Sequence, residues 1–223
     1  MLHGAQAETK SLVTDQDLIR ETLAAEPDIV SIDSPLSVPE GWNRSQEQLV
    51  DNSPIYRKCE LALKRMGISV FWCLLPTMKG LTMRGMRLAD EFRKHGLQVI
   101  ESYPGAAQDI LGIPRKGISL DELKWGLNRA GINGNYLWGR VTHDEVDAIT
   151  SALVGLFYLA DDYIALGTPQ EDYLIVPRSS KINYSRLSEI LSRTGLDELT
   201  TIETGGLECK LEARPASIPA FAD

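Results

Sequence analysis

Acidic side chains close two short apolar segments of the chain, and carboxylates in that position are suited to binding a metal ion. Residues 29–32 are mostly apolar and β-branched and predict a buried strand, with Asp33 at its end and Pro35 stopping it. Residues 97–105, LQVIESYPG, repeat the pattern with Glu101. Ligands of open α/β sheets bind beyond the carboxyl ends of the strands, so we expect both carboxylates to face one cleft. The alternative for Asp33 is a cap on the following turn.

A third group of acids opens the segment THDEVDAITSALVGLFYLA, whose apolar residues recur at helical spacing from Thr142 onward. Thr142 and Glu145 have the spacing of a capping box, so Glu145 is expected to be structural. Asp144, Asp147 and Ser151 share another face of this helix. Acids are favoured in a first helical turn, which is the alternative for Asp144, and an exposed charge is the alternative for Asp147. Beside the two strand-end acids, we favour metal ligands.

Carboxylates that converge from separate elements are the ligands that a hard cation needs. Mg²⁺ takes oxygen ligands, keeps several waters, and uses a few carboxylates together with substrate phosphate. Two such ions about 4 Å apart can activate a water and stabilise the leaving oxygen of a phosphodiester. The sequence therefore predicts a catalytic and metal site for Mg²⁺ or Mn²⁺ built from Asp33, Glu101, Asp144 and Asp147.

Five motifs occur in order within residues 29–177. They are IDSPL, an R-x-C-E segment with Arg57, Cys59 and Glu60, then VIESYPGA, LGIPRK and HDEVDA. In this series the chain resembles a domain-of-unknown-function family predicted to be RNase H-fold nucleases. The resemblance implies an RNase H-like α/β fold, with a mixed sheet flanked by helices, and acidic metal ligands at the four positions named above. The D-x-x-D pair of the last motif is also similar to that of bacterial Holliday-junction resolvases, which share the fold.

The N-terminal segment departs from that family. RNase H-like folds begin with a hairpin whose first strand carries an Asp central to the metal site. Nothing before Thr14 has the pattern of such a strand, and Glu8 is the only acid there. We therefore expect a fold without the usual hairpin and weak or absent nuclease activity. The strand at residues 29–32 would then pair with a second chain in a homodimer, or with the C-terminal segment around residues 199–202, or the protein would be marginally stable.

Charge bears on the choice of substrate. The chain has 31 acidic and 23 basic residues, a formal net charge of −8 and a pI of about 5.0, which disfavours non-specific nucleic-acid binding. Residues 55–95 differ, with nine basic and three acidic residues, which suits a phosphate backbone; two solvated helix faces are an equal alternative. Possible contacts to substrate phosphate are Arg57, Arg115 and Lys116. Aromatic residues that could stack bases, but are more often core residues, are Tyr103, Trp125, Tyr136 and Trp138.

Length and composition are those of an ordinary globular chain. With 223 residues, 43% hydrophobic and 24% charged, the chain can bury a core of normal size. Three cysteines, Cys59, Cys73 and Cys209, match no metal spacing, so we expect reduced, mostly buried thiols. No signal peptide or membrane span is visible, and a cytoplasmic protein is expected. We expect an RNase H-like domain over residues 1–177 and a C-terminal helix and tail over residues 178–223.

The remaining elements follow from periodicity and stop signals. Helices are predicted over residues 14–26, 55–66, 82–95, 106–111, 119–130, from 143 to a stop at 167–169, and over 184–193. A short edge strand is possible at residues 9–13, residues 68–75 are a strand or an extended segment, and residues 173–176 are a strand. Residues 39–54 and 133–139 predict loops.

Taken together, these features predict a metal-dependent nuclease that hydrolyses phosphodiester bonds of nucleic acid. Two alternatives stay open. One is a catalytically weak or inactive RNase H-like binding or regulatory protein. The other is an enzyme that acts on small phosphorylated substrates, which the acidic pI favours mildly.

Overall fold

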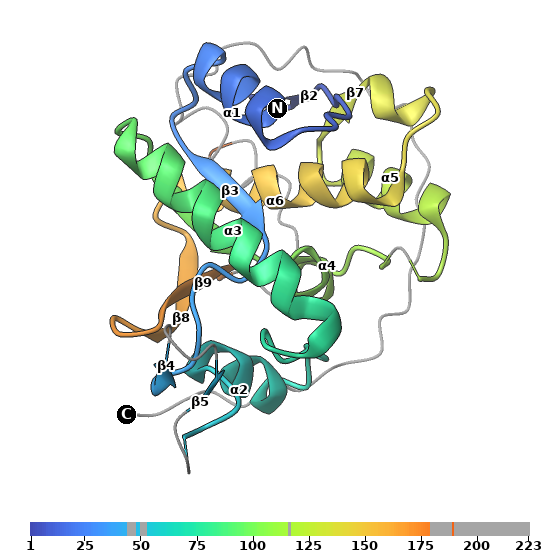
Figure 1. Ribbon diagram of the computed structural model, residues 1–223. Helices are drawn as coiled ribbons and strands as arrows, with labels where there is room; N and C mark the ends of the chain where they lie inside the picture. Colours follow the sequence, from blue (N-terminus) through green and yellow to red (C-terminus); the bar gives the residue numbers. More distant parts are fainter. Residues whose placement is uncertain (44–47, 50–52, 116, 179–188, 190–223) are drawn as a thin grey trace.

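The computed structural model describes residues 1–43, 48–49, 53–115, 117–178 and 189 (Figure 1). The helices are α1 (Asp15–Ala24), α2 (Lys58–Arg65), α3 (Pro76–Lys94), α4 (Pro104–Leu111), α5 (Leu120–Arg129) and α6 (His143–Leu159). The strands are β1 (Leu2–His3), β2 (Gln6–Ala7), β3 (Val30–Asp33), β4 (Trp42–Asn43), β5 (Gln48–Leu49), β6 (Val99–Ser102), β7 (Asn133–Gly134), β8 (Tyr163–Thr168) and β9 (Asp172–Pro177). A 3-10 turn, η1 (Asn135–Leu137), follows β7.

A four-stranded sheet in the order β3-β6-β9-β8 lies at the centre of this α/β protein. β3, β6 and β9 run parallel, and β8 pairs antiparallel with β9. β6 is buried at every position because it has a strand on each side and helices on both faces. β3 is an edge strand whose residues are half-buried or exposed. The prediction of a strand there is confirmed, whereas the prediction that this strand is buried was wrong.

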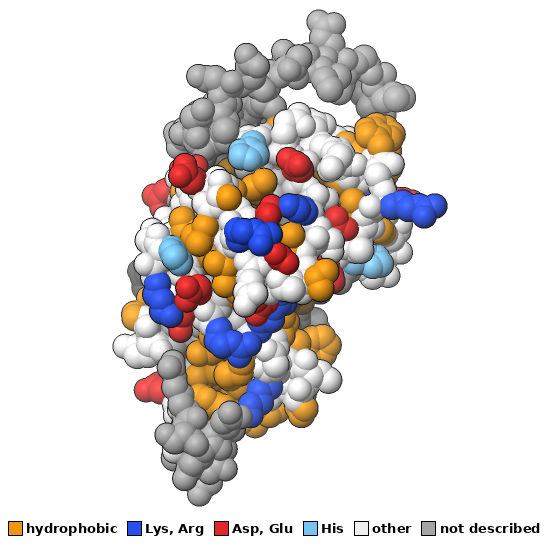
Figure 2. All heavy atoms as spheres, turned by 45° about the horizontal axis from the view of Figure 1, so that its top comes forward, with side chains coloured by type: hydrophobic (Ala, Val, Ile, Leu, Met, Phe, Trp, Pro, Cys, Tyr) orange, Lys and Arg blue, Asp and Glu red, His pale blue; other side chains and the backbone are white. Residues whose placement is uncertain are grey.

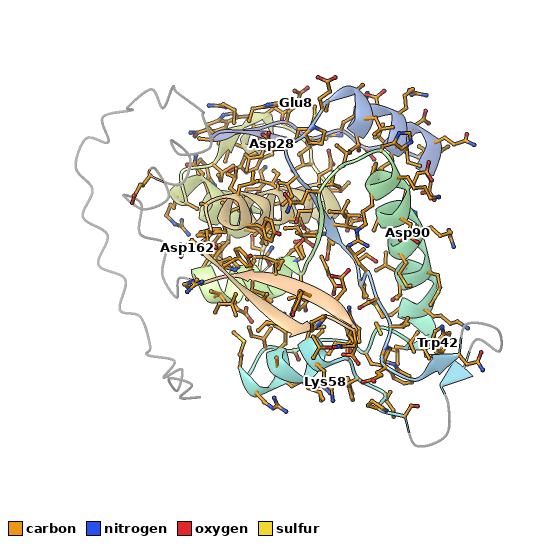
Figure 3. All side chains as sticks on the ribbon, turned by 90° about the vertical axis from the view of Figure 1, so that its left-hand side faces the viewer. Glu8, Asp28, Trp42, Lys58, Asp90 and Asp162 are labelled. Carbon is orange, nitrogen blue, oxygen red and sulfur yellow. The ribbon has the colours of Figure 1, made fainter. Side chains whose placement is uncertain are left out.

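Alternation of side chains divides the sheet residues between two faces. Val30 and Ile32 of β3 pack in one core cluster with Phe92 of α3. Ile100 of β6 packs in another cluster with Val154 of α6. Figures 1 and 3 show β3 between α3 and α6. We call the two sides of the sheet the α3 face and the α6 face.

α6 lies between the sheet and a second core. Val154 faces the sheet, while Leu153 packs with Leu123 of α5 in the cluster that also contains the N-terminal strands. Near the end of α6, the Tyr158 hydroxyl accepts a hydrogen bond of 3.0 Å from the side-chain amide of Gln98, a residue just before β6. The helix therefore runs antiparallel to β6, and its first turns lie at the carboxyl ends of β3 and β6.

A separate three-stranded sheet, in the order β1-β2-β7, contains the N-terminal residues. β1 and β2 form an antiparallel hairpin, and β2 pairs in parallel with β7. Gly134 allows this pairing, because its φ is +148° and a Cβ there would collide with the Ala7 carbonyl. The possible strand at residues 9–13 is not formed. The hairpin pairs with β7 and not with β3, so in the described part of the chain β6 is the one strand that β3 pairs with.

Within the described part of the chain, the predicted helices occur, with shifted ends. Thr14 caps α1 by accepting a hydrogen bond of 3.1 Å from the Asp17 amide, and Ser119 caps α5 in the same way. α3 begins six residues earlier than predicted because proline is favourable in a first helical turn. The prediction that α6 continues to residues 167–169 was wrong, since the helix ends at Leu159 and β8 follows.

Several short strands were not predicted. β4 and β5 lie within the loop expected at residues 39–54, and β7 lies within the loop expected at residues 133–139. Residues 68–75 form no strand. The helix predicted at residues 184–193 and the strand character noted at residues 199–202 fall outside the described residues, apart from Glu189.

Cys59 and Cys73 are buried free thiols, as the sequence predicts. Burial raises the pKa of the Cys59 thiol to about 12, so it stays protonated at neutral pH. Cys209 lies outside the described residues. Within the described part of the chain, no helix has the length and apolar character needed to cross a membrane.

Candidate functional site

The two strand-end acids lie on opposite faces of the central sheet. In the parallel pairing of β3 with β6, Ile32 is opposite Glu101, and Asp33 is opposite Ser102. Since Ile32 faces α3, Glu101 is on the α3 face, and alternation puts Asp33 and Ser102 on the α6 face. A hydrogen bond of 2.9 Å from Ser31 to Ser102 agrees with this assignment. The strands therefore bring Asp33 and Glu101 to one edge of the sheet but not to one face.

Glu101 forms a buried ion pair with Arg57. The two terminal nitrogens of Arg57 donate to the two Glu101 oxygens, each at 2.7 Å, and the Leu36 amide donates to Glu101 Oε2 at 2.7 Å. Both side chains are 2% exposed. Burial alone would lower the pKa of Arg57, but the charge and hydrogen bonds of Glu101 outweigh this effect, and the pKa is raised well above its ordinary value. Arg57 is thus held away from any surface that a substrate phosphate could reach.

Glu60 and Glu171 are also buried and accept several donors. Glu60 accepts from Arg57 Nε at 3.1 Å and from the Cys73 amide at 3.1 Å. Glu171 accepts from the Lys58 amide at 2.5 Å, at the start of α2, where the helix dipole favours a negative charge. Figure 3 shows Lys58 at this end of α2, beneath β8 and β9. We call Arg57, Glu60, Glu101 and Glu171 the buried charge network.

The buried charge network fixes the loop that follows Asp33. Glu101 holds the Leu36 amide, and Glu171 holds the Glu40 amide at 2.9 Å. Between these points, the Ser37 hydroxyl accepts from the network's arginine at 3.0 Å and donates to the backbone carbonyl of Glu171. The loop is therefore tied to β6, to α2 and to the turn between β8 and β9. This network positions the end of β3, and through it the backbone that carries Asp33.

Asp147 is 4% exposed, so the alternative interpretation of this residue as an exposed surface charge was wrong. Its Oδ1 accepts a hydrogen bond of 3.0 Å from the side-chain amide of Gln108 in α4. The same amide nitrogen donates to the Thr150 hydroxyl at 3.2 Å. Asp147 lies four residues before Ser151 and eight before Gly155, on the stripe of α6 that faces the sheet. A Cβ on Gly155 would lie 3.1 Å from Ile29. Asp147 therefore lies on the α6 face, near the carboxyl end of β3.

The other two acids of this segment differ from Asp147. Asp144 is exposed at the start of α6. Glu145 forms the predicted capping box: Thr142 Oγ accepts from the Glu145 amide at 3.2 Å, and the Glu145 carboxylate accepts from the Thr142 amide at 2.8 Å. The hydrogen bond from the Thr142 backbone lowers the pKa of Glu145. The structural role predicted for Glu145 is confirmed.

Three polar residues join the acids on the α6 face. Ser102 and Gln108 were not singled out from the sequence, and Ser151 was noted only because it shares a helix face with Asp147. A serine directly after a strand-end acid, as in the ES of VIESYPG, is a weak signal. Nothing in the sequence indicates that Gln108 contacts Asp147, because the contact joins two helices 39 residues apart.

The α6 face provides fewer carboxylates than the predicted four-acid metal site. Among the described residues, no group of three His, Cys, Asp or Glu side chains is placed to hold a metal ion. With Glu101 on the α3 face, the acids at this end of the α6 face are the buried Asp147 and the exposed Asp33 and Asp144. Mg²⁺ is commonly held by one or two carboxylates with waters and substrate oxygens. These residues therefore fit a cation site with two protein carboxylates, completed by a ligand.

The basic residues of the region 55–95 do not form one open patch. Arg57 is in the buried charge network, Arg84 pairs with Asp15 at 2.7 Å, and Arg93 pairs with Asp172 at 3.1 Å. On the face in Figure 2, Lys and Arg side chains alternate with Asp and Glu. Of the other predicted phosphate contacts, Arg115 pairs with Asp109 at 2.5 Å, and Lys116 lies outside the described residues.

The four aromatic candidates for base stacking differ in how far they are exposed to solvent. Tyr136 is a core residue whose hydroxyl donates to the Ile132 carbonyl at 2.7 Å. The Tyr103 hydroxyl donates to the backbone of the segment before α3. Trp125 and Trp138 are exposed and contact each other edge to face, with ring centroids 5.8 Å apart. These two tryptophans are the most exposed of the four.

Comparisons of the chain with protein-family models, with curated proteins and with solved structures found no match. The α/β architecture and the site geometry therefore carry the functional argument.

Proposed function

We propose that this protein is a metal-dependent hydrolase of phosphodiester bonds in nucleic acid, with RNase H-like topology and a cation site on the α6 face of the sheet. The observation that supports the proposal is the placement of a strand-end acid, Asp33, and a buried helix acid, Asp147, on the same face of the sheet, toward the carboxyl ends of its parallel strands. Ligands of open α/β sheets bind at this edge. The bound Mg²⁺ or Mn²⁺ would supply a Lewis acid and an activated water.

Three features support the topology. Three parallel strands, β3, β6 and β9, have helices on both faces, and the mixed sheet is open. The long helix α6 runs antiparallel to β6 and carries the D-x-x-D pair at the end where the strands finish. The chain's motifs IDSPL, VIESYPGA and HDEVDA supply β3, β6 and α6, the elements that build this edge.

The residues divide into two roles under this proposal. Asp33 and Asp147 would hold the cation, and Asp144, one turn from Asp147, would bind a water. Glu101 and Arg57 are positioning residues, because their hydrogen bonds are made to each other and to the loop after Asp33. Exposed Trp125 and Trp138 are candidates for contacts with bases.

The test is cleavage of single- and double-stranded DNA and RNA by the purified protein with Mg²⁺ or Mn²⁺. We expect weak, cation-dependent cleavage that Asp33→Asn and Asp147→Asn each reduce on the order of 100-fold or more. Glu145→Gln is the matched control, since this acid lies on the same helix turn and caps it. It should retain cleavage.

Two outcomes would contradict the proposal. Cleavage that persists in Asp33→Asn and Asp147→Asn would place the active site elsewhere. No cleavage of any nucleic acid, together with hydrolysis of the small diester bis(p-nitrophenyl) phosphate or of nucleotides, would favour an enzyme acting on small phosphorylated substrates.

A further inference from the structure

The side chain of Ser151 is a buried hydroxyl whose hydrogen-bonding capacity the described residues do not use. The residue is 2% exposed, and its Oγ has no hydrogen-bond partner within the described part of the chain. Other buried hydroxyls are satisfied: Thr150 donates to the Val146 carbonyl at 3.3 Å, and Thr82 donates to the Cys73 carbonyl at 2.7 Å. An unsatisfied buried polar group destabilises a fold, so a polar partner from outside the protein is expected at Ser151.

The position of Ser151 says where that partner would lie. Ser151 is four residues after Asp147 and four before Gly155, so the three residues form one stripe of α6. Gly155 meets β3 near its start, where its Cβ would lie 3.8 Å from Ser31. Because α6 runs antiparallel to the strands, Ser151 lies between this contact and Asp147, facing the end of the sheet that carries Asp33.

We infer that the Ser151 hydroxyl is part of the cation site, where it hydrogen-bonds to a water or ligand oxygen held by the divalent cation. The inference rests on the proposed function and adds a binding residue to it. Mg²⁺ keeps several of its waters when it is held by one or two carboxylates, and those waters need acceptors and donors in the protein. A buried hydroxyl one turn from Asp147 is suited to that task.

The experiment compares Ser151→Ala with wild type by calorimetric titration of Mn²⁺ and by thermal unfolding with and without Mn²⁺. Removing an unsatisfied hydroxyl should leave the Tm of the metal-free protein unchanged or raise it by about 2–4 °C. The same substitution should weaken Mn²⁺ binding about tenfold and reduce the Mn²⁺-induced rise in Tm. Thr82→Val is the control, because it removes a satisfied buried hydroxyl on the α3 face. It should lower the metal-free Tm and leave Mn²⁺ affinity unchanged.

The outcomes separate this inference from the proposed function. Equal Mn²⁺ affinity in wild type and Ser151→Ala would overturn the role of Ser151, leaving the cation site intact. A lower metal-free Tm in Ser151→Ala would also overturn it, because the hydroxyl would then have a structural partner. Absence of Mn²⁺ binding in the wild-type protein would overturn the cation site itself, and the role of Ser151 with it.

Discussion

Arg57 connects parts of the chain that are far apart in the sequence. Its guanidinium bonds to Glu60 three residues away, to Glu101 forty-four residues away, and to Ser37 in the loop after β3. The sequence allowed Arg57 to be a phosphate contact, because its bidentate partner, Glu101, lies forty-four residues away. That pairing becomes visible only in the folded chain, where the residue before α2 bonds to β6. At the scale of single residues, the network explains why an arginine is buried.

Loss of Arg57 should therefore be costly. Arg57→Ala leaves the buried carboxylates of Glu60 and Glu101 without their cation, and breaking a buried pair in this way costs about 3–5 kcal/mol. Urea unfolding measures this loss as a lower midpoint. Arg84→Ala is the matched control, because its pair with Asp15 is about half exposed and is worth about 1 kcal/mol or less. Equal midpoints for the two variants would refute the structural role of Arg57.

At the scale of elements, α6 shows what local sequence determines. Its capping box and its apolar stripes depend on residues three and four positions apart, and both were predictable. Its end was not, because apolar residues resume at 163–166 after Asp161 and Asp162, and pairing with β9 decides there between helix and strand. Long-range pairing also limited the prediction of the site. The roles of Asp147 and Glu145 could be predicted from spacing within one helix, whereas the sheet faces occupied by Asp33 and Glu101 depend on strand register.

The cap of α6 makes a pH-dependent contribution to stability. The pKa of Glu145 in the folded protein is lowered from its ordinary value of 4.5 by the Thr142 backbone donor. This contribution is therefore complete above pH 4.5 and is lost as the pH falls through the lower, folded-state pKa. Glu145→Ala removes the carboxylate that accepts from the Thr142 backbone, so it should lower the free energy of unfolding at about pH 7 by about 0.5–2 kcal/mol, and by less at about pH 3. Thermal unfolding across this range measures the difference, and an equal loss at both pH values would contradict it.

At the scale of the whole molecule, the edge of the central sheet is formed by β3. The Val30 amide donates to the Gln98 carbonyl at 2.8 Å, so Val30 and Ile32 bond to β6, and the backbone groups of Ser31 and Asp33 point outward. The sequence analysis predicted that the strand at residues 29–32 lacks one of its neighbouring strands. A homodimer that pairs two such edges remains a prediction, since outward backbone groups of this kind can accept another strand.

Ser31→Pro tests that dimer. Proline removes only the outward amide of β3, so the pairing with β6 is kept while an added strand is blocked. We expect light scattering to show a dimer for the wild-type protein and a monomer for Ser31→Pro. Ser31→Ala is the control for the lost hydrogen bond to Ser102 and should stay dimeric. A monomeric wild-type protein, or a dimeric Ser31→Pro, would show that the β3 edge is not a dimer contact.

The position of α6 between two cores has a consequence for local opening. Its sheet-facing stripe and its Leu153 side belong to different hydrophobic clusters, so the helix cannot detach without exposing both. Amide hydrogens in the middle of α6 can therefore exchange with solvent only through an opening that approaches global unfolding. Asp147 and Ser151 lie on this slowly exchanging segment, whereas Asp33 lies on an edge strand with fewer constraints. The candidate site thus combines residues of a rigid helix, α6, with a residue of β3, whose end is held in place by the buried charge network.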